Sequence, residues 1–378
     1  MPCWGKKWGD TVADRIPCCW PWLALHLRPV TVAPCCYMRR GVKLRHVFAA
    51  ADGGDPWNTP RLVEMRQALL DGNDEFCHPG CSFLQKPPEA KHVIDGSTNE
   101  AGTETVRQAL AAYERGDSVL EVGPAKLAVI LGKACNNRCV FCRIPPHLEK
   151  RRGPPYEMPD CVADVVRRYA PGLATIALTG GEPLIYLRDT AYLQRLGLLR
   201  PGLQTKVMTN GILLLDRLDV LTALDSLYAS VSLNAANAEH YRQLHRTDNF
   251  DRVVDGVREL LDAREGKPTR LSLNYLLTRT TLDTVPAFVE LAISLGVHEI
   301  SFGQLRVYVN CSVDPAEKVE PGTEEGDRFL RLLETARARL DERGIRNSWS
   351  GWNTKCDEAG LAKKEGRRCN SGKSTPSG

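Results

Sequence analysis

The sequence lacks any apolar run close to the roughly 18 residues that cross a membrane as a helix. Its first residues, MPCWGKKWGDTVADR, contain two lysines but not the apolar stretch of a secretory signal peptide. We therefore expect a cytoplasmic protein with no membrane partner.

The sequence also has little excess charge of either sign. Its formal net charge is +4 over 378 residues, and no basic cluster is interleaved with aromatic residues, so we expect no nucleic-acid partner. The phosphate-binding loop, the dinucleotide-binding glycine pattern and the serine-hydrolase nucleophile motif are missing as well. These absences remove several common classes of enzyme.

Cysteine, by contrast, is abundant, with 14 residues. In a chain of this length without a visible secretion signal, metal binding explains that number better than a disulfide framework does. The length is sufficient for two or three domains, and 43% hydrophobic with 25% charged residues is ordinary for a globular protein.

Three of the cysteines, Cys135, Cys139 and Cys142, have the spacing C-x3-C-x2-C. Asn136 and Asn137 favour a tight turn between the first two, which lets the thiolates converge on one centre. Closely spaced thiolates select iron–sulfur clusters or zinc, and three ligands leave one coordination position open. The spacing resembles the cluster motif of the radical S-adenosylmethionine (AdoMet) superfamily. That resemblance implies a [4Fe–4S] cluster held by these three cysteines, with AdoMet bound to its fourth iron.

From Lys126 onward, strand and helix patterns alternate, which is typical of βα units around a parallel sheet. Six such units predict an α/β fold, a partial (β/α)6 barrel of the TIM type, in which functional residues gather at the C-terminal ends of the strands. We expect strands over 126–132, 175–180, 205–210, 227–234, 270–277 and 299–305, with helices over 161–169, 189–195, 216–224, 251–263 and 284–295.

The second predicted strand runs into Gly180, Gly181, Glu182 and Pro183, which resemble the GGEP motif of the same superfamily. The resemblance implies that this segment receives the amino group of AdoMet. Glycines let the backbone approach a ligand closely, and a carboxylate such as that of Glu182 can complement an ammonium group.

Polar residues also end the next three strands. Asn210 lies in a TNG segment that is common in the superfamily, and the strand alternation should point Ser230, Ser232 and Asn234 to one side. The resemblance implies that Ser232 and Asn234 belong to the segment that contacts the ribose, with Ser232 preferred. Asn274 contacts AdoMet or substrate, or is a satisfied core amide. Phe141 packs near the adenine in this interpretation, or is simply a buried aromatic of the loop.

The N-terminal region is rich in cysteine, tryptophan and proline. Alternating residues between Cys19 and Cys35 predict a hairpin, and the pattern over 60–70 predicts a helix that starts after Thr59 and stops at Gly72. This region resembles the SPASM or twitch module, which implies that four cysteines hold an auxiliary iron–sulfur cluster. A structural zinc site is the alternative. The implied ligands are Cys19, Cys35, Cys77 and Cys81, with Cys18 and Cys36 as alternatives.

We expect an auxiliary cluster module over 1–90, a connector over 91–125 with a helix at 104–114, the barrel over 126–310, and a C-terminal segment over 311–378. That last segment should hold a helix near 324–342 and a flexible tail from Trp349. The remaining cysteines Cys311, Cys356 and Cys369 are expected to be ordinary thiols. Four histidines show no metal-binding spacing, and we expect them on surfaces or helix faces: His147, His240, His245 and His298.

The resemblance implies an enzyme that cleaves AdoMet reductively and uses the resulting 5′-deoxyadenosyl radical to abstract hydrogen. We expect oxidative modification of a peptide or small metabolite, with a reductant such as flavodoxin or ferredoxin. Two alternatives stay open: a redox-neutral epimerase, decarboxylase or lyase acting on a carbohydrate-like substrate, and a non-catalytic metal-binding scaffold. Molybdopterin-type cyclisation shares the GGEP and TNG segments, but there the cysteine motif lies near the N-terminus and a second cysteine set follows the barrel, so we place it lower.

Overall fold

The computed structural model describes residues 15–28, 31–35, 38, 41–43, 54–78, 81, 99–142, 160–308 and 311–350. Ten strands within these ranges form one sheet. Their bounds are β1 Ala24–Leu27, β2 Thr31–Ala33, β3 Val42–Lys43, β4 Lys126–Gly132, β5 Thr175–Gly180, β6 Gln204–Thr209, β7 Ser226–Val231, β8 Thr269–Leu277, β9 Glu299–Gln304 and β10 Arg346–Ser350.

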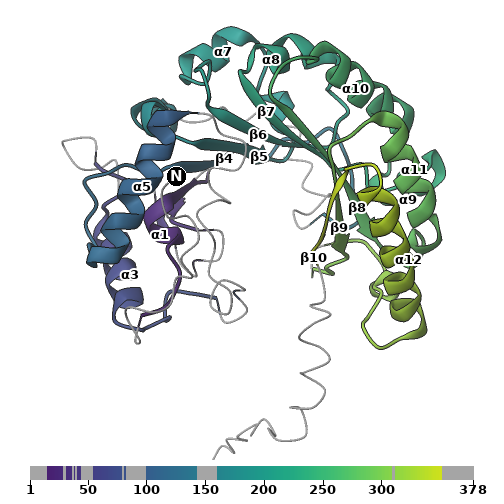
Figure 1. Cartoon of the computed structure of the whole chain (residues 1–378), viewed down its shortest axis with the longest axis horizontal. Helices are drawn as coiled ribbons and strands as arrows, with labels where there is room; N and C mark the ends of the chain where they lie inside the picture. Colours follow the sequence, from purple (N-terminus) through teal and green to yellow (C-terminus); the bar gives the residue numbers. More distant parts are fainter. Residues whose placement is uncertain are drawn as a thin grey trace, which may run out of the picture.

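The sheet order is β10-β9-β8-β7-β6-β5-β4-β1-β2-β3. Strands β4 to β9 are neighbours in chain order, and every pair among them is parallel. This confirms the predicted partial (β/α)6 barrel. The sheet bends into an arch that is not closed, with β10 and β3 as its edges (Figure 1).

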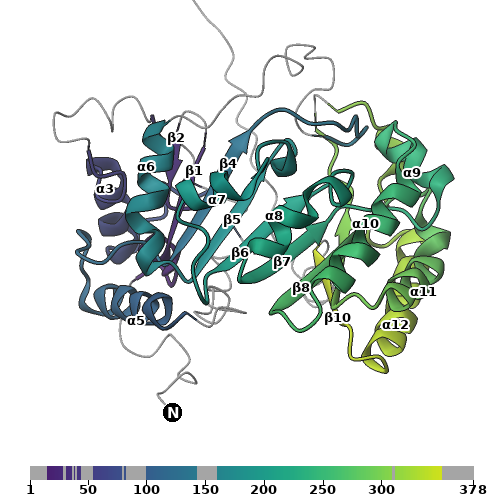
Figure 2. The ribbon, with the colours of Figure 1, turned by 90° about the horizontal axis from the view of Figure 1, so that it is seen from above.

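Helices cover the outer face of the arch, as the views from the front and from above show (Figures 1 and 2). The predicted helices between the strands are present, with ends shifted by a few residues at most. The helices are α1 Trp20–Leu23, α3 Pro60–Leu70, α5 Glu100–Arg115, α6 Asp160–Tyr169, α7 Thr190–Arg195, α8 Leu218–Ala223, α9 Ala238–His245, α10 Phe250–Ala263, α11 Val285–Leu295 and α12 Glu324–Asp341.

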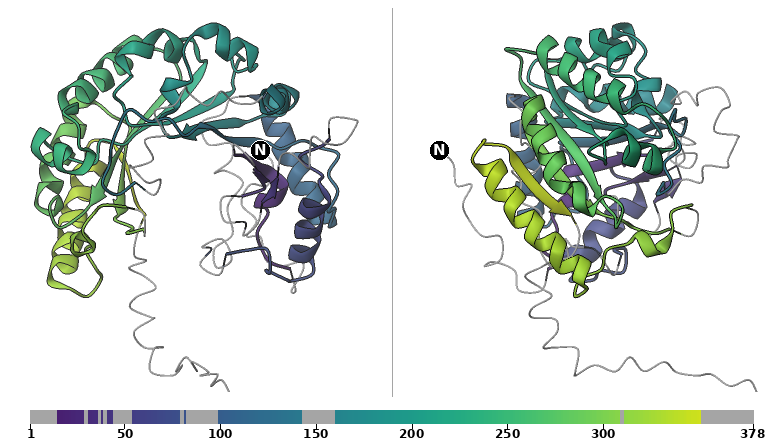
Figure 3. Two further views of the ribbon diagram at one scale, coloured as in Figure 1. Left: turned by 180° about the vertical axis from the view of Figure 1, so that it is seen from behind. Right: turned by 90° about the vertical axis from the view of Figure 1, so that its right-hand side faces the viewer.

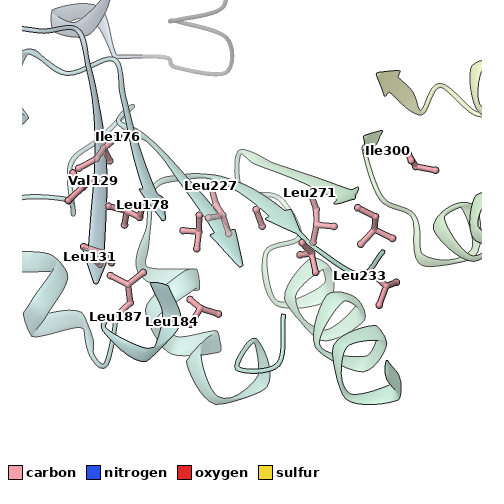
Figure 4. Packing of buried hydrophobic residues seen from close by; sticks show 14 of the residues in the cluster. Val129, Leu131, Ile176, Leu178, Leu184, Leu187, Leu227, Leu233, Leu271 and Ile300 are labelled. Carbon is pink, nitrogen blue, oxygen red and sulfur yellow. The ribbon is translucent and has the colours of Figure 1, made fainter. Parts of the chain in front are cut away.

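The main hydrophobic core lies between the sheet and these helices. In β4, Leu127, Val129 and Leu131 are buried, whereas Lys126 and Ala128 alternate with them and are half-buried. The same alternation on neighbouring strands places Ile176, Leu227 and Ile300 among others in one continuous apolar layer (Figure 4). The opposite, concave face of the sheet is therefore the more polar one.

The N-terminal region extends the same sheet. β1 pairs antiparallel with β2, which confirms the predicted hairpin, and it also pairs parallel with β4, with Ala24 opposite Lys126. Helix α5 packs closely against the turn before β5, where a Cβ on Gly102 would come within 2.4 Å of the Cα of Ala174. The domain boundaries proposed from the sequence stay a prediction.

The structure differs from the sequence prediction in three elements. β10 was not predicted: it joins β9 in parallel, and its Trp349 packs its ring on Phe329 of α12, with ring centroids 4.8 Å apart (Figure 3). Helix α9 was not predicted either, and β7 ends at Val231 instead of continuing to Asn234. β10 and α9 contain few apolar residues, so they lack the periodicity on which such predictions depend. No helix in the described ranges is long and apolar enough to span a membrane.

Candidate functional site

A loop that follows β4 carries the three closely spaced cysteines. We call residues 133–142 the cysteine loop. Cys135, Cys139 and Cys142 are partly exposed and form no disulfide. Because β4 to β9 are all parallel, their C-terminal ends lie along one edge of the sheet, and the cysteine loop lies among the segments that follow β5, β6 and β7.

The cysteine loop is bound by its backbone to the end of α9. The amide of Arg138 donates to the carbonyl of His245 at 3.2 Å, and that of Val140 donates to the carbonyl of Leu244 at 2.9 Å. The last carbonyls of a helix lack partners within it, so α9 supplies acceptors that the loop uses. The carbonyl of Val140 in turn accepts from the amide of Ser312 at 2.8 Å.

The glycines after β5 allow their backbone to lie directly against the cysteine loop. The amide of Gly181 donates to the carbonyl of Gly132 at 2.9 Å, and the amide of Glu182 donates to that of Ala134 at 2.8 Å. A Cβ on Gly181 would lie 2.2 Å from the carbonyl oxygen of Ala134, closer than any side chain permits. The visible reason for this glycine is therefore the approach of two loops.

Glu182 is fully buried and joins the ends of β5 and β6. Its carboxylate accepts hydrogen bonds from the amide of Leu184 at 3.0 Å, the hydroxyl of Thr209 at 2.8 Å and the amide of Asn210 at 2.7 Å. Burial raises the pKa of this carboxyl to about 7, against the lowering effect of the three hydrogen bonds. Pro183 begins the short 3-10 turn Pro183–Ile185 that follows. The structure shows a framework role for Glu182, and its expected contact with AdoMet stays a prediction.

Asn210, directly after β6, contacts the cysteine loop. Its Nδ2 donates to Oδ1 of Asn136 at 2.7 Å and lies 3.7 Å from Sγ of Cys135, while its Oδ1 accepts from the amide of Ile212 at 3.0 Å. The side chain is largely buried. Asn210 therefore holds the first cysteine of the loop against the end of β6.

The polar residues after β7 divide into two groups. Nδ2 of Asn274 donates to Oγ of Ser230 at 3.0 Å and approaches Oγ of Ser232 at 3.4 Å. Asn234 has the left-handed φ of 61°, and its side chain points to His245, with Nδ2 lying 3.3 Å from Nε2. The expectation that Ser230, Ser232 and Asn234 share one side is wrong for Asn234, because β7 ends before it.

His245, the last residue of α9, is fully buried at the centre of the site. Its Nδ1 lies 3.1 Å from Sγ of Cys139 and 3.0 Å from Nδ2 of Asn137. The imidazole stacks on Tyr241 with ring centroids 4.3 Å apart, and Phe141 meets it edge-on at 5.6 Å. Burial lowers the pKa of this imidazole to about 4.

The sequence analysis missed this residue, because it assigned His245 to a surface or helix face. A lone histidine in a polar segment gives little signal, and the contact joins residues 106 positions apart. His147 lies outside the described residues. The expected place of Phe141 near the adenine stays a prediction, since the structure shows its ring against His245.

The N-terminal cysteines gather near α1. Burial raises the pKa of the Cys18 thiol, and the neighbouring thiols of Cys19, Cys35 and Cys77 raise it further. Burial also raises the pKa of Cys19 to about 12 and that of Cys77 to about 11, the latter helped by Cys81. Cys18, an alternative ligand in the sequence analysis, therefore has more thiol neighbours than that analysis assumed. Cys36 lies outside the described residues, as do Cys356 and Cys369.

Among the described residues, no three histidine, cysteine, aspartate or glutamate side chains are arranged to hold a single metal ion. The ligand sets therefore stay predictions that depend on the chemistry of the donors. In the cysteine loop that chemistry fits an iron–sulfur cluster: three unbridged thiols lie on one short loop, with the amide of Asn210 and the imidazole of His245 beside two of them.

Comparison with known proteins agrees with this donor set. Residues 129–292 match the Radical SAM superfamily. A relative from Saccharolobus solfataricus, named a probable GTP 3′,8-cyclase, is 32% identical over 184 residues, which cover 47% of this chain and 56% of the relative. One with the same name from Sulfurisphaera tokodaii is 29% identical over 180 residues, covering 47% and 55%. The chain thus spans about half the length of the curated relatives it matches.

Solved structures show a more distant likeness. Streptococcus suis SuiB bound to the precursor peptide SuiA has 16% identity and a TM-score of 0.48, covering 68% of this chain and 56% of SuiB. The enzyme anSMEcpe with bound AdoMet has 16% identity and a TM-score of 0.48, covering 60% and 64%.

Proposed function

Because residues 129–292 belong to the radical SAM superfamily, we propose that this chain is a radical SAM enzyme whose [4Fe–4S] cluster is held by Cys135, Cys139 and Cys142. One observation carries the proposal: the cysteine loop is bound to the segments that follow three consecutive parallel strands, through Glu182, Asn210 and His245. A loop needed only for folding would not require partly exposed thiols at that place.

When bound, the reduced cluster supplies the electron that cleaves AdoMet into methionine and a 5′-deoxyadenosyl radical. The chain's own residues hold the site in place and limit access of water to it. Glu182 and Asn210 fix the loop segments against each other, and the Ser230–Asn274 pair presents polar groups on the concave face of the sheet. The proposed contacts of AdoMet are Phe141, Gly180, Gly181, Glu182, Pro183, Asn210, Ser232, Asn234 and Asn274.

The reaction class that we favour is hydrogen abstraction followed by oxidative modification of a peptide or small metabolite. Its support is the second group of thiols, in which Cys18, Cys19, Cys35 and Cys77 influence one another electrostatically. An iron–sulfur cluster there would accept an electron from a substrate radical, and flavodoxin or ferredoxin would reduce the first cluster. Zinc at this site would instead be purely structural.

A second candidate is a redox-neutral rearrangement of a nucleotide. It is favoured by the name of the relatives that match 184 residues of the chain, which are called GTP 3′,8-cyclases. GTP contains a ribose, so this candidate narrows the carbohydrate-like alternative of the sequence analysis and raises its place.

The test begins with anaerobic reconstitution using iron and sulfide, followed by AdoMet and dithionite, beside a Cys142→Ala variant. We expect 5′-deoxyadenosine from the wild type only. Zinc in place of iron, with no product, would support the scaffold alternative. About eight iron atoms per chain, against about four in a Cys18/Cys19/Cys35/Cys77 alanine variant, would establish the auxiliary cluster. Adding GTP or a peptide mixture and identifying products by mass spectrometry would then separate the two reaction classes.

A further inference from the structure

The buried imidazole of His245 is the one polar side chain that meets both the cysteine loop and the segment after β7. We propose that His245 donates a hydrogen bond from Nδ1 to the iron-bound sulfur of Cys139, and thereby sets the reduction potential of the cluster. The proposal depends on the proposed function, because it assumes that Cys139 is a cluster ligand.

The first argument is geometric. Nδ1 lies 3.1 Å from Sγ of Cys139, a short distance for a hydrogen bond to sulfur. The ring is held in place from several sides: Tyr241 stacks on one face, Phe141 meets it edge-on, and its own backbone carbonyl accepts from the cysteine loop. A ring fixed in this way cannot turn away from the sulfur without disturbing its neighbours.

The second argument concerns donors and acceptors. A thiolate bound to iron only accepts hydrogen bonds, so the nitrogen that faces it must carry the proton. The other nitrogen, Nε2, then has to accept, and Nδ2 of Asn234 lies 3.3 Å from it as a donor. Neutral imidazole meets both requirements, so no net charge has to be buried.

Asn137 favours the opposite tautomer while Cys139 is a free thiol. Its Oδ1 accepts from the amide of Arg138 at 2.9 Å and from the hydroxyl of Thr247 at 3.1 Å, which turns its Nδ2 toward Nδ1 of the imidazole. The backbone carbonyl of Leu233 is then available to accept from Nε2. Donation to Cys139 is therefore a property of the cluster-loaded protein.

The consequence is a change in redox chemistry. Hydrogen bonds to the sulfurs of an iron–sulfur cluster favour its reduced, more negative form and raise its potential. Asn210 lies near Cys135 in a comparable position, but at the longer distance of 3.7 Å. We therefore expect His245 to have the larger effect of the two.

The test uses two substitutions that separate the ring nitrogens. The amide nitrogen of asparagine takes the place of Nδ1, whereas that of glutamine takes the place of Nε2. In H245N the donor to Cys139 is kept, and in H245Q it is lost. The matched control is H240Q on the same helix, because Nδ1 of His240 faces Thr284 and not the cysteine loop.

The measurement is the midpoint potential of the reconstituted cluster, followed by electron paramagnetic resonance. We expect a negative shift for H245Q, a smaller one for H245N and none for H240Q, with wild-type iron content throughout. Equal potentials for H245N and H245Q, both loaded with iron, would overturn the inference. Should either variant fail to load, the reduced wild type labelled with ¹⁵N-histidine decides, because absence of an exchangeable proton and an imidazole nitrogen coupled to the cluster would also overturn it.

These outcomes differ from failure of the proposed function. A wild type that forms 5′-deoxyadenosine but shows no imidazole coupling would contradict only the role of His245. A wild type that holds no iron–sulfur cluster would contradict both.

Discussion

Gly181 lies so close to Ala134 that the two segments they belong to cannot be separated by even one methyl group. A Cβ on Gly181 would lie 2.2 Å from the carbonyl oxygen of Ala134 and 2.5 Å from that of Lys133. Both obstacles are backbone atoms of the cysteine loop, so neither can rotate out of the way. The position of the cysteine loop therefore depends on the absence of a side chain after β5.

Gly181→Ala should consequently displace the cysteine loop. Overpacking in a well-packed region costs typically about 1–3 kcal/mol, and we expect a loss of that size in the free energy of unfolding measured by chemical denaturation. Gly172→Ala is the control, because its Cβ would meet only the hydroxyl oxygen of Thr105, at 3.0 Å, on a side chain that can adjust. Equal stability of the two variants would contradict the close approach.

The buried carboxyl of Glu182 should make stability depend on pH. Its pKa is raised from 4.5 to about 7 by burial, so between these values the folded protein binds a proton that the unfolded chain does not. Stability from this group is thus present at low pH and is lost as the pH rises through about 7, by about 3 kcal/mol in all.

The comparison of wild type with Glu182→Gln isolates this effect. Burial lowers the pKa of His26 to about 3 and that of His245 to about 4, and both groups remove stability as the pH falls below their unfolded values. They titrate in both proteins and cancel in the difference. We expect wild type to gain on the variant as the pH is lowered from 8 to 5 in urea denaturation, and a constant difference would refute the assignment.

Asn210→Ala should loosen the cysteine loop. It removes the donor to Asn136 and leaves the amide of Ile212 without its acceptor, and a buried group left unsatisfied costs about 1–3 kcal/mol. Iron should therefore leave the reconstituted variant faster than wild type when a chelator is added. Asn347→Ala is the control, since that side chain makes a single exposed hydrogen bond to Asp341. Unchanged iron loss from the Asn210 variant would show that Asn210 does not hold the loop.

The six parallel strands of the barrel were predictable because each is a short apolar run between turn signals. β10 and α9 were not, since their stabilising contacts come from the sheet edge and the cysteine loop and leave little apolar pattern. A local rule cannot detect an element whose partners lie elsewhere in the chain.

The candidate site divides in the same way. The C-x3-C-x2-C and GGEP segments were visible because each is continuous in the sequence. His245 was not, because its role comes from contacts with Cys139 and Asn137, which are more than 100 positions away. Glu182 was identified, but its buried hydrogen bonds to the end of β6 were not foreseen.

Arg66 is a second residue whose role no pattern predicted. It lies on the buried side of α3 and is fully buried, where its guanidinium donates to the carbonyls of Pro21 and Trp57, both at 2.9 Å, and of Ser118 at 3.1 Å. It also lies 4.3 Å from the ring centroid of Trp57. One side chain thus joins α1, the segment before α3 and the segment after α5.

Arg66→Met should destabilise the N-terminal region, because methionine fills much of the space but leaves these carbonyls unpaired. We expect a loss of at least about 2 kcal/mol in the free energy of unfolding. Arg61→Met on the same helix removes the same charge but only an exposed ion pair with Glu64, which is worth about 1 kcal/mol at most. Since both variants change the net charge equally, a similar loss in the two would show that the effect is one of charge and not of the buried hydrogen bonds.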